Sequence, residues 1–205
     1  MARPKNEELH QQRREEILRA AARTFKRCGF HAARTEDICA EAGLSSGTVF
    51  RHFASKHEMI MEIASREYAF YQSQIQQLAT REGLEWLSTL DADKLEEMLT
   101  PSEYDLGSDS WLELSRLDPW RGQLTAFESE LRRTLAERLV AGQQEGWVRT
   151  DVNGLGAAHL LCAVITGLLF ERDIGLTSGR AETARTLAAL CRAQLMTCPP
   201  PHSNP

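Results

Sequence analysis

Apolar residues recur along most of the chain at spacings of three and four, which place them on one face of an α-helix. The first such stripe contains Ile17, Ala21, Phe25 and Cys28, and it predicts a helix that ends before Gly29. No segment shows the alternation of apolar and polar residues that is typical of a half-buried strand. The pattern therefore predicts an all-α fold.

A short helix is predicted to begin at Thr35, whose hydroxyl can cap the helix by accepting a hydrogen bond from a backbone N–H group of the first turn. Glu36 and Asp37 place negative charge at the positive end of this helix. Gly43 is expected to end it, because glycine adopts at low cost the left-handed conformation that turns the chain sharply.

A second short helix is predicted to begin at about Ser46, with Ser45 or Ser46 as its cap. Val49 and Phe53 lie four residues apart and form its buried stripe, so the polar side chains between them point outward. Two short helices joined at a glycine, with a polar outer face on the second, form a helix-turn-helix. Such a motif can place its second helix in the major groove of DNA.

A long helix is predicted to follow at once, since Ser55 and Glu58 have the spacing of a capping box. Its apolar stripe runs from Ile60 to Leu78 and is long enough to join one domain to the next. Glycine and proline breaks divide the rest of the chain into further helices. These are predicted at 85–99, 110–117, 122–142, 152–173 and 177–196.

The net charge of −5 would argue against nucleic-acid binding if it were spread evenly. Residues 1–60 contain 11 lysines and arginines against 8 aspartates and glutamates, whereas residues 61–205 contain 13 against 21. The part that carries the helix-turn-helix is thus the basic part, which suits the neutralisation of phosphates.

The five cysteines and six histidines show no short-spaced pairs of the kind that bind zinc or exchange disulfides. The cysteines are Cys28, Cys39, Cys162, Cys191 and Cys198. We interpret them as reduced and structural, with a redox sensor as the alternative. No metal or cofactor is expected.

One segment, 152–170, is 19 residues long without a formal charge and approaches the length that spans a membrane. It contains Asn153, His159, Thr166 and three glycines, so a buried helix is the preferred interpretation. The first five residues lack the apolar stretch of a secretory signal, and the protein is expected in the cytoplasm, with no membrane partner.

A set of short stretches, all in register between residues 14 and 59, carries a family resemblance. They include Arg14-Glu15-Glu16-Ile17, Thr24-Phe25, Gly29-Phe30-His31-Ala32, Ala42-Gly43-Leu44-Ser45, Gly47-Thr48-Val49-Phe50 and Phe53-Ala54-Ser55-Lys56. Together they resemble the DNA-binding domain of the TetR family of bacterial transcriptional regulators. Phe50, another candidate DNA contact, departs from the tyrosine usual there and lacks a hydroxyl directed at phosphate. Slightly weaker anchoring to the DNA backbone is expected, although its ring can still pack. Cys39 replaces a small residue and is expected to pack between helices.

The resemblance implies the organisation of the whole chain. Residues 1–54 would form the three-helix DNA-binding domain, 55–198 a helical domain for ligand binding and dimerisation, and 199–205 a flexible tail. The long helix would join the two domains. A small-molecule effector would move it, so that the two DNA-binding domains of a homodimer no longer match adjacent grooves of the DNA operator.

Candidate DNA contacts fall into two groups. Hydroxyls, a ring N–H and a lysine at a helix start suit phosphates, and the residues of this kind are Thr35, Ser45, His52 and Lys56. Ser46, Thr48 and Arg51 are placed to touch bases, Arg51 by a bidentate pair with guanine. Gly47 allows the backbone to approach closely. Helix capping alone is the alternative for the threonine and the serines, and a solvated surface position is the alternative for the arginine.

All four tryptophans and all three tyrosines lie after residue 60, outside the reading domain. The resemblance implies a ligand site between helices there, with ordinary core packing as the alternative for each aromatic residue. The candidates are Tyr71, Trp86, Tyr104, Trp111, Trp120, Phe127, Cys162 and Thr166. Glu113 and Glu128 could favour a cationic ligand, although charges there are also explained by a solvated face.

The last two predicted helices combine leucines with small residues, which permits close helix packing. Two such helices from each of two chains would make a four-helix bundle, and filling the core of a monomer is the alternative. No nucleophile elbow, phosphate-binding glycine loop or metal-ligand pair is found, so an enzyme is not expected. The predicted function is a repressor released by a small molecule; the alternative is a ligand-binding or protein-interaction module with little specific DNA binding.

Overall fold

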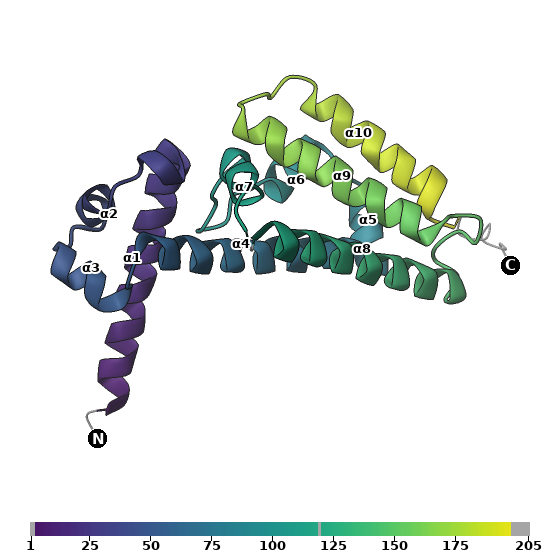
Figure 1. The fold of residues 1–205 in the computed structure, drawn as a ribbon. Coiled ribbons are helices and arrows are strands. Elements are labelled where there is room, and N and C mark those ends of the chain that lie inside the picture. Colours follow the sequence, from purple (N-terminus) through teal and green to yellow (C-terminus); the bar gives the residue numbers. More distant parts are fainter. Residues whose placement is uncertain (1–2, 119, 198–205) are drawn as a thin grey trace, which may run out of the picture. The chain divides into compact units, whose positions relative to one another are not determined.

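The computed structural model describes residues 3–118 and 120–197, with side chains from Glu7 onward (Figure 1). Within these residues the chain forms ten α-helices and one π-helical turn. Backbone pairing of the β type is limited there to an isolated antiparallel bridge between Val148 and Met196. The predicted all-α fold is confirmed. The predicted tail, 199–205, lies outside the described residues.

The chain divides into two compact units. The first unit comprises 1–71 together with 101–121, and the second comprises 72–100 together with 122–205. Helix α4 (Lys56–Leu78) begins in the first unit and ends in the second. The domain boundaries at 54 and 198 stay a prediction.

In the first unit, α2 and α3 lie beside α1, and α7 belongs to the same unit (Figure 1). Its elements are α1 (Arg3–Ala32), α2 (Thr35–Ala42), α3 (Ser46–His52), the first part of α4, and α7 (Ser108–Leu114). Ile17, Phe25, Ile38 and Ile63 are completely buried in its core, and burying such a side chain contributes about 1.5–3 kcal/mol.

The first helix was predicted to end before Gly29, and α1 has a kink at that residue. The backbone leaves the helical region at Gly29 (φ 74°, ψ 169°), but helical structure resumes and continues to Ala32. A positive φ is the conformation that glycine tolerates and other residues rarely adopt, so the sequence signal marked a kink rather than an end.

The second unit is built from five helices and the last part of α4. Its further elements are α5 (Arg81–Ser88), α6 (Ala92–Met98), α8 (Trp120–Gln144, from Gly122 onward), α9 (Gly154–Asp173), α10 (Arg180–Leu190) and the π-turn Cys191–Leu195. The single helix predicted at 85–99 is wrong, because the chain forms two helices there. Thr89 ends α5, and the side chain of Asp91 caps α6 by accepting the Lys94 N–H (2.9 Å).

Helix α9 is long and apolar enough, by length and composition alone, to cross a membrane. One of its faces is buried within the second unit, where Ala158, Cys162 and Leu168 are packed away from solvent. Leu168 packs with Leu95 of α6 and Ala184 of α10 in the same apolar cluster. A helix with one face covered by its own unit fits the core-helix interpretation.

Candidate nucleic-acid interface

The turn between α2 and α3 has the predicted geometry. Gly43 adopts the left-handed conformation (φ 64°, ψ 32°), and its N–H donates to the carbonyl of Ala40 (3.2 Å). The Ser45 hydroxyl accepts the N–H of Thr48 (3.3 Å), so Ser45 caps α3, which begins at Ser46. These features are the stop and start signals expected from the sequence.

The cap of α2 is not the predicted one. The helix begins at Thr35, and the residue in the cap position is Arg34, whose backbone N–H donates to the carboxylate of Asp37 (2.9 Å). Thr35 is half-buried in the first turn. The capping interaction therefore comes from the aspartate reaching back rather than from the threonine hydroxyl.

Helix α3 has one buried and one exposed face. Val49 and Phe53 are completely buried, as predicted, although α3 ends at His52 and Phe53 follows it. Most of the residues predicted to meet DNA lie at the surface: Ser45, Ser46, Gly47, Phe50 and Arg51 are exposed, while Thr48 and His52 are half-buried. The ring of Phe50 is half exposed, so it contributes less packing than expected.

Arg14 of α1 holds the end of α3, and the sequence analysis gave it no role. Its guanidinium donates to the carbonyl oxygen of His52, lies over the Phe53 ring at 4.1 Å, and pairs with Glu62 of α4. A carbonyl at a helix end is an orphan acceptor, and a cation there also opposes the negative end of the helix dipole. Its position one turn before Ile17, where the apolar stripe of α1 begins, was the available signal.

Lys56 begins α4 and is tied to the protein rather than free. Its ammonium donates to the carbonyl oxygens of Phe30 (2.6 Å) and Ala33 (2.9 Å), which leaves one of three donor hydrogens for a phosphate. The neighbouring capping box is modified: Ser55 accepts the N–H of Glu58 (3.1 Å), but the glutamate accepts the N–H of Ala54 (2.7 Å).

His52 sits against a second imidazole. Its ring lies 4.3 Å from that of His10, and its Nδ1 is buried without a hydrogen-bond partner in the described part of the chain. Burial lowers the pKa of His52 below its ordinary value, and the charges of His10, Arg14, Arg51 and Arg13 lower it further. The free protein therefore favours a neutral ring at this position.

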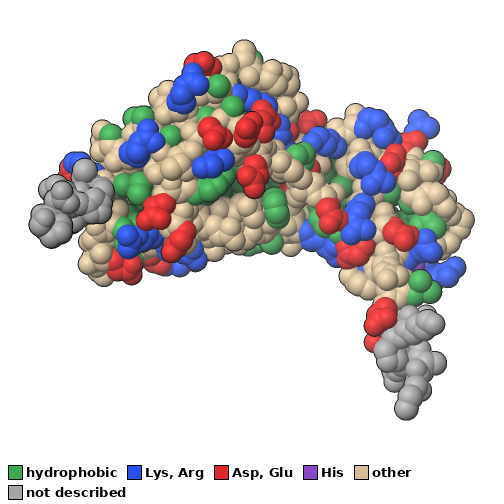
Figure 2. Space-filling model, turned by 180° about the vertical axis from the view of Figure 1, so that it is seen from behind, with side chains coloured by type: hydrophobic (Ala, Val, Ile, Leu, Met, Phe, Trp, Pro, Cys, Tyr) green, Lys and Arg blue, Asp and Glu red, His purple; other side chains and the backbone are tan. Residues whose placement is uncertain are grey.

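Acidic and basic side chains are interspersed on the face of each unit that Figure 2 shows. An acid of α2 pairs with two arginines of α1: Glu41 contacts Arg23 (2.7 Å) and Arg27 (3.3 Å). Much of the positive charge near the helix-turn-helix is thus balanced within the protein. Only the basic side chains that are exposed and not balanced by an acid are available to contact a phosphate.

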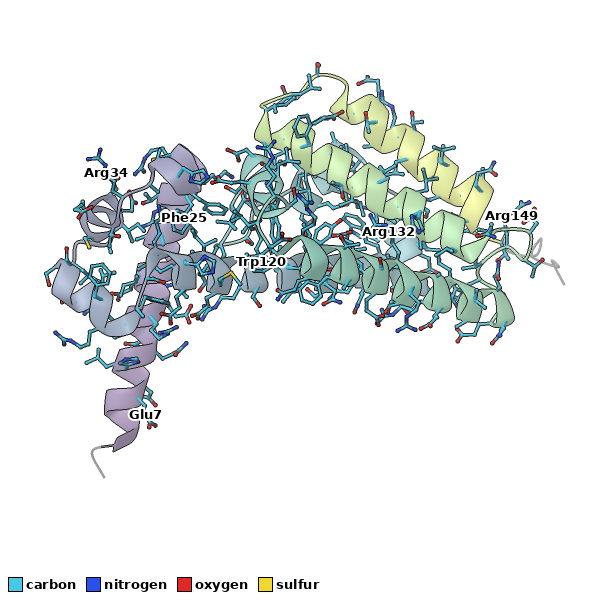
Figure 3. The ribbon with its side chains drawn as sticks, viewed as in Figure 1. Glu7, Phe25, Arg34, Trp120, Arg132 and Arg149 are labelled. Carbon is cyan, nitrogen blue, oxygen red and sulfur yellow. The ribbon has the colours of Figure 1, made fainter. Side chains whose placement is uncertain are left out.

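The predicted ligand residues divide between the units. In the first unit, Trp120 is buried, points toward α4 and donates its indole N–H to the sulfur of Met61 (Figure 3). Tyr104 accepts a hydrogen bond from Arg66 (2.8 Å), and Trp111 packs half-buried against the same core. Tyr71, also half-buried, has its ring 6.3 Å from that of Tyr68.

In the second unit, Trp86 packs half-buried on the cluster around Leu168. Cys162 is buried, whereas Thr166 and Phe127 are exposed. The two carboxylates considered for a cation are already paired: Glu113 with His31 (3.0 Å) and Glu128 with Arg132.

An open groove of about 540 Å³ lies between the second half of α8 and the start of α9. It is lined by Arg133, Ala136, Glu137, Val140, Ala141, Gln144, Asn153, Gly154 and Leu155. None of the predicted ligand residues lines this groove.

Cys39 is buried between helices, as expected, and Cys162 and Cys191 are buried in the second unit. Burial raises the pKa of Cys162, and it raises that of Cys191 to about 11, so both stay protonated thiols at neutral pH. Cys28 is exposed, and Cys198 lies outside the described residues. Across 3–118 and 120–197, no three histidine, cysteine or acidic side chains are grouped so that they could hold a metal ion.

Comparison with known proteins agrees with this geometry. A family profile described as "Bacterial regulatory proteins, tetR family" matches residues 17–63, which cover α2, α3 and the start of α4. The HTH-type transcriptional repressor AcnR of Corynebacterium efficiens is 30% identical over 176 residues, spanning 82% of this chain and 87% of that protein. The chain belongs to the TetR family.

Other TetR-family relatives cover nearly the whole chain. The HTH-type transcriptional regulator UidR of Escherichia coli K12 is 27% identical over 183 residues, which are 86% of this chain and 90% of that protein. A transcriptional regulator from Saccharomonospora viridis, solved in complex with choline, aligns with a TM-score of 0.68 and 26% identity over 92% of this chain and 100% of that one. The protein is therefore a TetR-family transcriptional regulator with a helix-turn-helix.

Proposed function

We propose that this TetR-family regulator represses transcription by binding a palindromic operator as a homodimer, and that a small molecule releases it. The observation that carries the proposal is the two-faced helix α3. Val49 anchors its inner face, while Ser46, Gly47 and Arg51 stand at the surface where base edges would lie. Arg51 would pair with guanine, and Ser45, His52, Thr35 and Lys56 would meet phosphates.

An exposed apolar face on α9 and α10 supports the dimer. Six large apolar side chains there or just beyond α9 are between 41% and 62% exposed: Leu155, Leu160, Phe170, Ile174, Leu176 and Leu190. A soluble monomer rarely leaves such a set uncovered, and a second copy would bury it in a four-helix bundle. A two-fold axis would then present two α3 helices to major grooves about 34 Å apart.

Release requires that the effector bind better to the conformation that does not fit DNA. The choline complex of the Saccharomonospora relative supports a small effector, and the aromatic residues named above are its candidate contacts. The proposal names no effector for this chain. It places the protein in the cytoplasm, without catalytic activity, since its relatives are DNA-binding regulators.

Selection from random double-stranded DNA, followed by fluorescence anisotropy on the selected fragment, tests the DNA reading. Arg51→Ala should flatten the preference at one position of each half-site, a loss of about 1–3 kcal/mol in discrimination. Arg81→Ala, an exposed arginine of α5, is the matched control and should leave the preference unchanged. An unchanged preference in Arg51→Ala would overturn the assignment of this residue to bases.

Light scattering tests the dimer separately. The wild type should have the mass of two chains at micromolar concentration, and Leu160→Glu, at the most exposed of the six apolar positions, should have the mass of one. A monomeric wild type would exclude the dimer. Failure to select any sequence would favour a ligand-binding or protein-interaction module instead of a repressor.

A further inference from the structure

We propose that residues 101–121 act as a coupling segment, which transmits the state of the second unit to the reading helix α3 through a chain of side-chain contacts. The inference rests on the proposed function, because it describes how operator binding and release are linked. It adds a second route, through residues 101–121, to the one that α4 supplies.

The route begins with the path of the chain. Residues 101–121 belong to the first unit, yet both α6 before them and residues 122–144 of α8 after them belong to the second unit. The polypeptide therefore crosses between the units at three places, 71/72, 100/101 and 121/122. A rearrangement in the second unit can pull on the first through the coupling segment as well as through α4.

Apolar contacts fix the coupling segment within the first unit. Leu106, Leu114 and Trp120 are at most 3% exposed and lie in the same core cluster as the buried faces of α1, α2, α3 and α4. Trp120 also donates its indole N–H to Met61 of α4. The core behind the helix-turn-helix is thus completed by this segment, and the segment cannot move without disturbing it.

Three acidic residues of the segment pair with basic residues spaced along α1. Glu103 pairs with Arg19, Asp105 with Lys26, and Glu113 with His31 (3.0 Å). The Asp105 carboxylate is nearly buried, so its pair is shielded from solvent more than an ordinary surface ion pair. Together these pairs hold α1 from its middle to the link that leads into α2.

Glu113 reaches the kink of α1 by a second contact. Its carboxylate accepts the backbone N–H of Phe30 (3.3 Å), directly after Gly29. Phe30 is also the residue whose carbonyl receives the Lys56 ammonium. The coupling segment and the start of α4 therefore both bind the backbone of Phe30, the former at its N–H and the latter at its carbonyl, at the entrance to the helix-turn-helix.

A continuous set of polar contacts then leads to the end of α3. The Tyr104 hydroxyl bonds to Glu15 and to Arg66, and Arg66 bonds to Glu15 (2.5 Å) and Glu62 (2.6 Å). Glu62 pairs with Arg14, which in turn donates to the carbonyl of His52, the last residue of α3. Packed, paired side chains of this kind carry coupling when the element at either end has two arrangements.

Linkage makes this route testable without knowing the effector, because coupling is reciprocal: if the segment controls operator binding, operator binding must also stabilise the segment. The experiment is amide hydrogen exchange on the full-length protein, alone and saturated with the selected operator fragment. In the wild type, operator should slow exchange of the 103–114 amides by about tenfold, and a fragment of unrelated sequence should slow it less.

Variants separate the route from general stabilisation. Tyr104→Phe and Glu62→Gln interrupt the polar contacts and should reduce the slowing to under about threefold in the saturated complex. Glu130→Gln, in an exposed pair with Arg133 on α8, is the matched control and should behave as the wild type. Unchanged exchange of 103–114 in a saturated wild-type complex, or full slowing in both variants, would overturn the proposal. Absence of any sequence-selective complex would instead overturn the proposed function.

Discussion

The ammonium of Lys56 donates a hydrogen bond to the backbone carbonyl of Phe30 across 2.6 Å. The bond joins the first residue of α4 to the last part of α1, and a second bond from the same ammonium reaches Ala33. The lysine that sequence reasoning assigned to phosphate is thus also an internal brace. The two roles are compatible because an ammonium has three donors.

Lys56→Ala should therefore affect both stability and DNA binding. The free energy of unfolding, measured by urea denaturation, should fall by about 1–3 kcal/mol, because two carbonyls lose a charged donor. Affinity for all DNA sequences should fall together, with a smaller dependence on salt. Lys94→Ala, which removes an exposed ammonium bonded to Thr89, serves as the control. If Lys56→Ala had normal stability but weakened DNA binding, the result would contradict the role of Lys56 as an internal brace and would support only its contact with phosphate.

Two glycines near the turn should respond oppositely to alanine. Gly43→Ala should destabilise the protein by about 1–2 kcal/mol, since φ is 64° and a β-carbon is strained there even in open space. Gly47→Ala places its β-carbon in open space within α3 and should stabilise the fold by about 0.5 kcal/mol. The latter variant should nevertheless bind operator more weakly if backbone and DNA approach closely. Equal affinity of Gly47→Ala and wild type would contradict that role.

Operator affinity should rise as pH falls from neutral toward acid values. Burial and the neighbouring His10, Arg14, Arg51 and Arg13 lower the pKa of His52 in the free protein, so its ring is neutral there. A DNA phosphate would favour the protonated ring, raise its pKa and make binding take up a proton.

Anisotropy titrations from pH 8 to pH 5.5 measure the slope of operator affinity against pH. His52→Gln should remove most of it, and His57→Gln, at an exposed position of α4, should preserve it. A His52→Gln variant with the wild-type slope would exclude this histidine as the source.

Protein stability should fall as pH rises from about 4.5 to about 8. Burial, and then the charge of Asp105, raise the pKa of Glu67 from 4.5 to about 8. Because the folded value lies above the unfolded one, the stabilisation is complete below about pH 4.5 and is lost as pH rises through about 8. The loss is on the order of 5 kcal/mol, because the folded and unfolded pKa values differ by about 3.5.

Urea denaturation of Glu67→Gln at several pH values checks this. The variant keeps an acceptor for the N–H of Leu106, and its stability should depend less on pH than that of the wild type. Glu85→Gln, at an exposed position of α5, is the control. Equal pH dependence in Glu67→Gln and wild type would exclude this carboxyl group.

Local signals predicted the reading motif well. Gly43 and Ser45 act within a few residues of their own positions, so their conformations follow from backbone sterics and capping, which a sequence displays directly. The predicted cap of α2 was wrong because two side chains within three residues, Thr35 and Asp37, could both make a capping interaction. The sequence does not show which of them does so.

Contacts between distant residues were not predictable in the same way. The assignment of Tyr104 and Trp120 to a ligand site stays a prediction, and the sequence did not indicate that Tyr104 bonds to Glu15 of α1 or Trp120 to Met61 of α4. Periodicity shows that a side chain faces inward but not which element it meets. The break of 85–99 into two helices depended on Asp91, a capping residue inside an otherwise helical pattern.

The burial of Leu106, Leu114 and Trp120 behind the helix-turn-helix bears on the engineering of hybrid regulators. A chimera that joins residues 1–71 to the effector domain of another protein through a single splice in α4 would leave a hollow where these three side chains belong. A hybrid that keeps this DNA specificity needs three splice points. Residues 101–121 must be transferred together with residues 1–71, because they complete the core of the same unit.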